Sequence, residues 1–405
     1  MGADALISAM DRAISALAEH PRKELLLFHH NDTDGLTSGT ILKTAFIRSG
    51  YRVNRRSLEK PYPQVLEKIF QKEGTIIVFT DFAGKIAPLI ASLNRKRNLV
   101  LIIDHHPAEK AEDETVHTLD GALFGLQGDR DISASATCFL FAARLSGENR
   151  DLAHLGALGA VGDGFLVDGK LVSVNRECLM EAVQQHTMRY DAQDTGETYF
   201  ITLGGREYPA REVCRSLDAL GGVGYYEGGT DSGIRVCEKG FDAEQKQQAA
   251  GYEAIQKRIF DRELEILTSG GLHTTEHLQW FDVRERFHPM GVKMIGVFCS
   301  IIKDMNFLDH SKYLAGFQTV QDEIPGFGPI PFHSKKISMR VSKALTAEIR
   351  KGTMPGLSSF LPEATVRIGG FADACHSLSA ATTIRTGLEE ELVSHIELVL
   401  KEKMR

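Results

Sequence analysis

The chain of 405 residues contains no CxxC pair, a single tryptophan and no apolar run long enough to cross a bilayer. Its 6 cysteines are scattered along the sequence, which argues against a zinc ribbon or a disulfide scaffold and fits a reducing cytoplasm. The first residues carry acidic side chains and no unbroken apolar stretch, so we expect no signal peptide. We therefore expect a soluble, cytoplasmic protein with no membrane partner.

Positive charge is not in excess either. The chain has 47 basic and 54 acidic residues, which gives a net charge of -7. A protein that coats duplex DNA through bulk charge would be basic, so any binding of nucleic acid must use a local groove. The composition itself, with 42% hydrophobic and 25% charged residues, is ordinary for a globular protein and argues against a disordered or fibrous one.

The length predicts more than one domain, because one hydrophobic core rarely serves a chain of this size. The character of the sequence changes between residues 240 and 271, where a long helix with mixed charges is expected over residues 243–267. We therefore divide the chain into a domain of residues 1–240, a helical connector of residues 241–270 and a second domain of residues 271–405.

The N-terminal domain shows apolar runs that alternate with helical patterns. Runs at residues 24–30, 74–83 and 98–106 are typical of buried parallel strands. The helical patterns lie at residues 3–18, 35–48, 62–71, 85–94, 133–145 and 151–161. This alternation predicts βαβ units and an open parallel sheet.

The rest of the chain has less regular patterns. Residues 196–226 are rich in turn signals and contain two GG pairs. Four expected strands of the second domain lie at residues 279–287, 292–302, 312–320 and 335–342. Helices are expected at residues 342–351 and 387–403, so the second domain is also of the α/β class.

The first strand run ends in the string His30-x-Asp32-x-Asp34-Gly35. Asp32 and Asp34 alternate, so both can project the same way from an extended segment. Two close carboxylates repel each other unless a cation neutralises them. Alone the string is weak evidence, because an Asp that caps a helix beside a surface histidine explains it equally well.

Two further strand runs also end in ionisable side chains. Asp81 follows the second run, and Asp104, His105 and His106 follow the third. Asp163 lies at the end of an expected helix. Because the carboxyl ends of parallel strands face one crevice, we expect these groups to converge. Carboxylate oxygens together with imidazole suit manganese or magnesium better than structural zinc.

This combination resembles the motifs of the DHH phosphoesterase superfamily, which includes RecJ-type single-strand exonucleases, nanoRNases, cyclic-dinucleotide phosphodiesterases and family II inorganic pyrophosphatases. The order and spacing match over residues 24–164, and residues 292–384 resemble the superfamily's DHHA1 substrate domain. The resemblance implies an α/β fold, in which an N-terminal open parallel sheet with flanking helices (the DHH domain) is joined to a smaller C-terminal α/β domain across a cleft. Residues 168–271 carry no resemblance.

The resemblance also implies a two-metal site that holds manganese, with magnesium as the alternative. The ligands of one ion would be His30, Asp32 and Asp81, and those of the other would be Asp34, Asp81, His105 and Asp163. Asp81 would then bridge the two ions. His106 would face the scissile phosphate as a donor or general acid, and Asp104 would orient the histidines.

In the C-terminal part, Ser338-Met339-Arg340 resembles the serine-x-arginine strand of the family. Gly369-Gly370 resembles its glycine-rich phosphate-binding loop, although the usual string that follows is altered here. His376 would replace the loop histidine, displaced by several positions. The resemblance implies that these residues bind substrate phosphate. Without it, Arg340 is more often a structural residue.

Together these features predict a metal-dependent phosphodiesterase that acts on single-stranded nucleic acid or short oligonucleotides. One alternative is a hydrolase of small phosphoesters, such as a cyclic dinucleotide or 3'-phosphoadenosine 5'-phosphate. Another is a non-catalytic scaffold of the replication machinery, although the intact set of ligand positions weighs against it. The serine-x-arginine strand and the glycine pair make an inorganic pyrophosphatase less favoured. A homodimer is compatible with the sequence.

Overall fold

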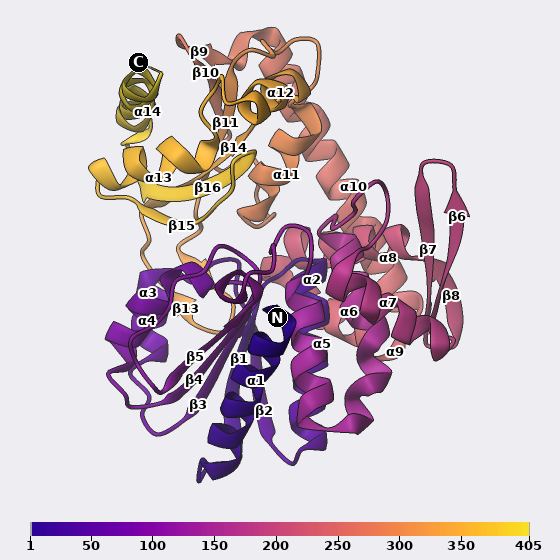
Figure 1. Ribbon diagram of the computed structural model, residues 1–405. Coiled ribbons are helices and arrows are strands. Elements are labelled where there is room, and N and C mark those ends of the chain that lie inside the picture. The colour runs from indigo at the N-terminus through magenta and orange to yellow at the C-terminus, as the bar shows by residue number, and fades with distance from the viewer. Residues whose placement is uncertain (1, 405) are drawn as a thin grey trace. The chain divides into compact units, whose positions relative to one another are not determined.

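The computed structural model describes residues 2–404 (Figure 1). The chain forms two compact units, Met1–Glu253 and Ala254–Arg405. The boundary between them lies within a single helix, α10 (Ala243–Ile266). None of the helices in the described part of the chain is long and apolar enough to cross a membrane.

The first unit is built on a sheet of five parallel strands in the order β2-β1-β3-β4-β5. Their bounds are β1 (Glu24–His29), β2 (Arg52–Ser57), β3 (Ile76–Thr80), β4 (Leu99–Asp104) and β5 (Val116–Asp120). The three apolar runs form β1, β3 and β4, each almost wholly buried. Two strands were not expected from the sequence: β2, which is polar and lies at an edge of the sheet, and β5, which is short and mixed.

Helices flank the sheet of the first unit. They are α1 (Gly2–Glu19), α2 (Thr33–Arg48), α3 (Pro63–Ile69), α4 (Ala87–Asn94), α5 (Ala134–Leu145) and α6 (Ala153–Gly162), with 3₁₀ turns η1 (Gly84–Ile86), η2 (Gly121–Phe124) and η3 (Gly147–Leu152). The chain turns back after β2, so right-handed crossovers put α2 on one face and α3 and α4 on the other. Helices α5 and α6 pack with α2.

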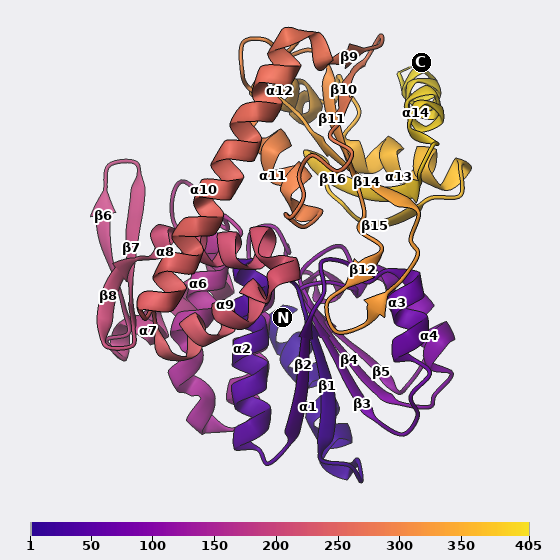
Figure 2. The same ribbon diagram turned by 180° about the vertical axis from the view of Figure 1, so that it is seen from behind.

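Residues 165–253 form a second layer of helices and a small antiparallel sheet. The sheet has the order β6-β7-β8, from β6 (Met188–Gln193), β7 (Gly196–Leu203) and β8 (Arg206–Pro209), and it extends from the helices in both views (Figures 1 and 2). The helices are α7 (Ser173–Gln184), α8 (Ala210–Asp218) and α9 (Gly229–Lys239), with a π-helical turn η4 (Ala219–Val223) and a 3₁₀ turn η5 (Tyr225–Glu227). Residues 196–226 are therefore more regular than their turn signals predicted.

The second unit contains a mixed sheet in the order β15-β16-β14-β11-β10-β9. After η6 (Leu267–Gly271), its strands are β9 (His273–Thr274), β10 (Leu278–Asp282), β11 (Tyr313–Thr319), β14 (Ser334–Arg340), β15 (Phe371–Cys375) and β16 (Ser379–Arg385), and a separate hairpin pairs β12 (Glu323–Ile324) with β13 (Gly328–Pro329). Its helices are α11 (Lys293–Ile302), α12 (Lys343–Lys351), α13 (Leu357–Arg367) and α14 (Glu389–Lys403). Strands β10 and β11 are parallel, and the other pairs are antiparallel.

One expected strand of this unit is wrong. The apolar stretch of residues 292–302 forms helix α11, not a strand. A short apolar run does not distinguish a buried strand from a buried helix by periodicity. The topology decides it, because the parallel strands β10 and β11 need a crossover connection, and α11 supplies it.

The core of the second unit lies between its sheet and helices α13 and α14. Ile337 and Met339 of β14 face this core together with Phe360 of α13 and Ile396 of α14. Helix α11 packs against β11 and β14 on the other face, where a Cβ on Gly296 would lie 3.0 Å from the hydroxyl oxygen of Ser338. The α/β class predicted for both parts of the chain is confirmed.

Candidate metal centre

The carboxyl ends of β1, β3 and β4 meet at one edge of the five-stranded sheet. The strand order reverses at β1, whose two neighbours are β2 and β3, and such switch points are where open α/β sheets bind ligands. Asp81 follows β3 with a φ of 64°, a left-handed conformation that is rare for a residue with a side chain. Strained backbone of this kind clusters at functional sites. The strand ends therefore form the candidate site.

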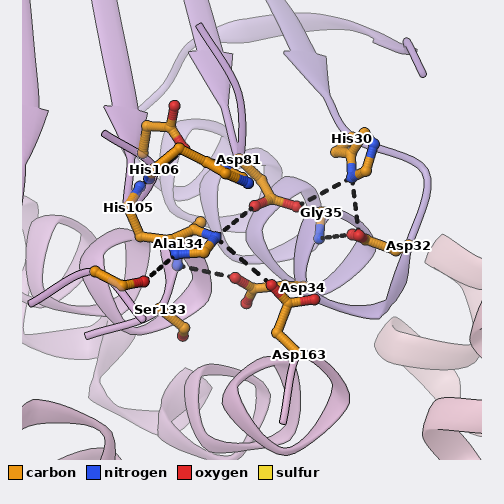
Figure 3. Close-up of polar contacts among 12 residues, drawn as sticks. His30, Asp32, Asp34, Gly35, Asp81, His105, His106, Ser133, Ala134 and Asp163 are labelled. Atoms are coloured by element: carbon orange, nitrogen blue, oxygen red, sulfur yellow. Dashed lines mark hydrogen bonds and ion pairs between the residues drawn. The ribbon is translucent and has the colours of Figure 1, made fainter. Parts of the chain in front are cut away.

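The structure brings together all six residues that the sequence suggested as metal ligands. They form two groups, in each of which one ligand atom per residue lies within 4.8 Å of the others: His30, Asp32 and Asp81, and Asp34, Asp81, His105 and Asp163. Asp81 belongs to both groups. In Figure 3 the side chains of His30, Asp81 and His105 point toward one another, and dashed contacts link them.

Asp34 is fully buried at the start of α2. Its two carboxylate oxygens accept hydrogen bonds from the backbone N–H groups of Ala134 and Ser135, at 2.9 and 3.0 Å. These amides belong to the first turn of α5, whose positive dipole end favours a carboxylate. Burial, and next the Asp81 carboxylate, nevertheless raise the pKa of Asp34 to about 7.

The donor set fits divalent cations. Both carboxylate oxygens of Asp81 are buried and accept no hydrogen bond from the residues that the structure describes, while each lies 3.4 Å from an imidazole nitrogen, one of His30 and one of His105. A buried carboxylate without hydrogen-bond donors is costly unless a cation is present. Burial and the Asp32 carboxylate raise the pKa of Asp81, which reflects the same excess of negative charge. Hard oxygen and imidazole ligands of this kind suit manganese or magnesium.

His105 is oriented by the backbone of a distant loop. Its Nδ1 hydrogen bonds the carbonyl oxygen of Gly128, which places the ring proton on that nitrogen. Its Nε2 then faces the carboxylates of Asp81 and Asp163, at 3.4 and 3.5 Å. Such a hydrogen bond on the far nitrogen is the usual support of a histidine that binds a metal.

His106 and Asp104 form a pair beside the ligand groups. The Nδ1 of His106 lies 2.8 Å from Oδ1 of Asp104, which is fully buried, whereas the His106 side chain is 24% exposed. Burial would raise the pKa of Asp104, but His106 and the hydrogen bonds hold it below the ordinary value. Burial and His105 would lower the pKa of His106, yet the Asp104 carboxylate raises it. His106 can therefore hold a proton and present it outward.

Residues far along the chain support residues 31–33 of the candidate site, and the sequence patterns did not predict them. Asp218, at the end of α8, accepts hydrogen bonds from the backbone and hydroxyl of Thr33, at 2.9 and 3.0 Å. The carbonyl of Gly221 in η4 accepts one from the side chain of Asn31. No local signal connects these positions with residues 31–33, which are more than 180 residues away along the chain.

Asp120 is a further buried acid that was missed. It ends β5, beside Asp104 of β4 in the register of the parallel pair. The signal was present, because Asp120 is the last residue of a short strand as Asp104 is the last residue of β4, but the sequence pattern did not predict the strand itself.

In the second unit, Ser338 and Arg340 lie on β14 under helix α11. Ser338 is buried, and Arg340 donates hydrogen bonds to the Ser300 hydroxyl and to the carbonyl of Met339, both at 2.8 Å. Burial lowers the pKa of Arg340. Among the side chains that the structure describes, no carboxylate pairs with this guanidinium, which leaves a positive charge available to an anion.

The expected phosphate loop is not assembled as the sequence suggested. The N–H groups of Gly369 and Gly370 donate to the carbonyls of Val366 and Thr365, both at 2.9 Å, and so cap the C-terminus of α13. Both amides therefore donate hydrogen bonds within the chain, and neither is free to donate to a substrate phosphate as the sequence had suggested.

The strand register also separates the glycine pair from Arg340. Arg340 lies opposite Ser379, whose carbonyl accepts the N–H of His376. The glycine pair precedes Phe371, which lies opposite Thr383 at the other end of the same strands. His376 therefore shares an end of the sheet with Arg340, and the glycine pair does not.

Comparisons with known proteins agree with this arrangement. Residues 24–159 match the DHH family, N-terminal domain. An uncharacterized protein of Methanocaldococcus jannaschii is 30% identical over 161 residues, which are 38% of this chain and 35% of that protein.

Two solved structures share the fold over nearly all of the chain. One is RecJ of Thermus thermophilus in complex with Mn²⁺, with a TM-score of 0.63 at 14% identity, covering 97% of this chain and 55% of that one. The other is the DHH domain of a protein described as a member of a ribosomal-protein family, with a TM-score of 0.63 at 15% identity, covering 100% of this chain and 92% of that one. This chain thus spans only part of the Methanocaldococcus relative and of the Thermus RecJ.

Proposed function

We propose that the chain is a member of the DHH/DHHA1 phosphoesterase superfamily and a metal-dependent phosphodiesterase that hydrolyses single-stranded nucleic acid or short oligonucleotides, because residues 24–159 match the DHH family and the fold resembles that of RecJ. The observation that carries this proposal is the pair of ligand groups that share Asp81. Manganese is the proposed metal, since the Thermus RecJ structure contains it, and magnesium is the alternative.

The residues that would hold the two ions are His30, Asp32, Asp34, Asp81, His105 and Asp163. When bound, the ions would supply an activated water and positive charge for the phosphate oxygens. The protein's own part is to hold the carboxylates in place. The α5 amides fix Asp34, and the Gly128 carbonyl fixes His105.

His106 is proposed as the group that donates a proton at the scissile phosphate. Asp104 accepts the hydrogen bond of Nδ1, so Nε2 is the nitrogen that would carry the proton toward the substrate. The Asp104 carboxylate raises the pKa of His106, which favours the protonated form of the ring. Asp104 is thereby a positioning residue and His106 the proposed catalytic acid.

Arg340 is proposed to bind a phosphate group of the substrate, together with Ser338 on the same strand and His376 in the turn between β15 and β16. The support is its partly buried guanidinium, which has no carboxylate partner among the described side chains. A guanidinium can bind phosphate through two parallel hydrogen bonds. A substrate with several phosphates, such as an oligonucleotide, offers phosphate groups besides the scissile one for this guanidinium to bind.

The test is hydrolysis by the purified chain with Mn²⁺ or Mg²⁺. Substrates are labelled single-stranded DNA and RNA of graded length, cyclic dinucleotides and 3'-phosphoadenosine 5'-phosphate, and the Asp81→Asn variant is the control for contaminating nucleases. The proposal predicts cleavage of the oligonucleotides by the parent chain and none by the variant.

Other outcomes would reassign the function. Cleavage of the small phosphoesters alone would make the chain a small-molecule phosphoesterase. Binding of metal and of single strands without any cleavage would favour the non-catalytic scaffold.

A further inference from the structure

Asp120 is fully buried beside the proposed catalytic pair and has an unusual environment. Its Oδ1 accepts a hydrogen bond from the backbone N–H of Ala122, at 2.8 Å. Its Oδ2 is buried and has no hydrogen-bond partner among the described residues. A buried carboxylate oxygen without a donor is costly if the group is ionised.

An oxygen of Asp104 lies in the same small region as Oδ2 of Asp120. A Cβ built on Gly84 would lie 2.9 Å from Oδ2 of Asp120 and 3.0 Å from Oδ2 of Asp104, so both oxygens border the same point. The two residues are also register partners on β4 and β5. Two carboxylates in one buried site do not both ionise, and one of them keeps a proton.

The numbers of hydrogen-bond donors around the two carboxyl groups differ. Asp104 accepts from the N–H of Gly84 at Oδ2 and from the N–H of His105, the N–H of His106 and the His106 ring at Oδ1. Asp120 accepts from one N–H only, that of Ala122, within the described part of the chain. The charge is therefore stabilised on Asp104, and the proton belongs on Asp120.

We propose that Asp120 is held as a neutral carboxylic acid whose Oδ2–H faces Oδ2 of Asp104, and that it is a positioning residue for the Asp104–His106 pair. The inference rests on the proposed function of His106. A proton on Asp120 gives Asp104 a donor on the side away from His106 and holds the carboxylate in place. Ionisation of Asp120 would instead set two like charges side by side and disturb the pair.

The groups around Asp120 agree with this assignment. Burial, and next the Asp104 carboxylate, raise the pKa of Asp120 to about 7, against the opposing effects of the Ala122 amide and the imidazoles of His105 and His106. Turn η1 contributes the Gly84 amide to Asp104.

The nearby lysine of that turn faces elsewhere. Lys85 is exposed and pairs with Glu109. Asp104, His105 and His106 are thus the ionisable groups that act on Asp120 from the neighbouring strand and the residues after it.

Two substitutions separate the protonated acid from the carboxylate. In Asp120→Asn the amide oxygen still accepts from Ala122, and the NH₂ donates to Asp104 as the acid would. Asp120→Leu has similar size but donates nothing. We expect kcat/KM of Asp120→Asn to match the parent at pH 6 and to exceed it above pH 7, whereas Asp120→Leu loses about 10–100-fold at both, the usual cost of removing an outer partner. Asp194→Asn, on the exposed β6–β7 turn, is the matched control.

A second measurement does not depend on turnover. In the Mg²⁺-loaded chain, ¹³C NMR of labelled aspartate side chains should show a carboxyl that titrates near pH 7 and is missing from Asp120→Asn. If the chain shows this signal but cleaves no substrate, the inference about the proton on Asp120 stands and the proposed function is wrong. Two results would overturn the inference. One is a loss of activity at pH 6 that is as large in Asp120→Asn as in Asp120→Leu, and the other is an Asp120 carboxyl that titrates near pH 4.

Discussion

Asp81 is the side chain shared by both groups of candidate metal ligands. It leaves β3 in a left-handed conformation, is almost fully buried and belongs to both groups of ligands. The carboxylates that surround it repel one another in the absence of cations. Stability and metal binding therefore oppose each other at this residue, and substitution should separate them.

The change Asp81→Asn should abolish metal-dependent turnover while the fold persists. It removes a charge shared by both ions, so the loss should exceed the roughly 10–100-fold cost of removing an outer partner of a ligand. Without metal the variant should be as stable as the parent or more so, because repulsion is relieved. Thermal unfolding with and without Mn²⁺, and a hydrolysis assay, test both parts. Near-normal activity would contradict a shared, bridging carboxylate.

The raised pKa of Asp34, about 7, predicts that metal binding is coupled to pH. A cation needs the ionised carboxylate, so Mn²⁺ affinity should rise as pH increases from about 6 to about 8 and then level off. Calorimetry in buffers of different ionisation enthalpy should detect proton release on binding near pH 7. Affinity that is flat across this range would mean that Asp34 is already ionised in the metal-free chain.

The same shift predicts how stability varies with pH in the metal-free chain. The folded state holds the Asp34 proton more tightly than the unfolded chain, so this group favours folding below its ordinary pKa of 3.8. The contribution falls as pH rises and is lost near pH 7. Chemical denaturation of the parent and of Asp34→Asn should therefore converge at acidic pH and diverge toward neutrality, with the variant becoming the more stable. Curves that stay parallel from pH 4 to pH 7 would contradict the shift.

At the scale of elements, the site depends on how closely α6 approaches α2 and α5. A Cβ on Gly159 of α6 would lie 2.2 Å from both Oδ1 of Asp34 and the hydroxyl oxygen of Ser135. Only glycine lets the helix approach a ligand carboxylate this closely. The packing of the three helices thereby fixes the position of Asp34, a proposed metal ligand.

The change Gly159→Ala should therefore displace Asp34. Overpacking of this kind costs about 1–3 kcal/mol, and Mn²⁺ affinity should fall with it. The control is Gly251→Ala on α10, where a Cβ meets nothing within 4 Å and the better helix former should add about 1 kcal/mol of stability. Unfolding and metal titration of both variants test this. Unchanged metal affinity in Gly159→Ala would show that α6 does not constrain Asp34.

At the scale of the whole molecule, the two units carry different tasks in the proposed function. The first holds the ligand groups, and the second holds Arg340. The change Arg340→Ala should lower kcat/KM about 10- to 150-fold, from the 1.5–3 kcal/mol of a hydrogen bond to a charged group, and leave metal binding intact. The exposed Arg350 of α12, changed to alanine, is the matched control.

The salt dependence of the reaction rate is a second test of the role of Arg340. If the substrate is a polyanion that releases counterions on binding, added salt should inhibit Arg340→Ala less than the parent. Initial rates over a range of salt concentrations measure this. If Arg340→Ala shows the kinetics of the parent on every substrate, Arg340 of the second unit does not bind substrate.

The sequence by itself determined the class of the fold and the members of the candidate ligand set. Buried parallel strands appear as continuous apolar runs, so local patterns predicted β1, β3 and β4. The acids and histidines of the site lie directly after these runs, so the same patterns also indicated His30, Asp81 and His105. Such positions can be read without tertiary contacts because strand ends meet at one edge by geometry alone.

Only the tertiary structure decided the rest. It made residues 292–302 a helix, since the crossover between β10 and β11 needs one, and it used the amides of Gly369 and Gly370 to cap α13. It also brought Asp218 to Thr33 and Asp120 to Asp104. These outcomes depend on which surfaces pack together across long separations in the chain, and periodicity within a short window contains no information about such packing.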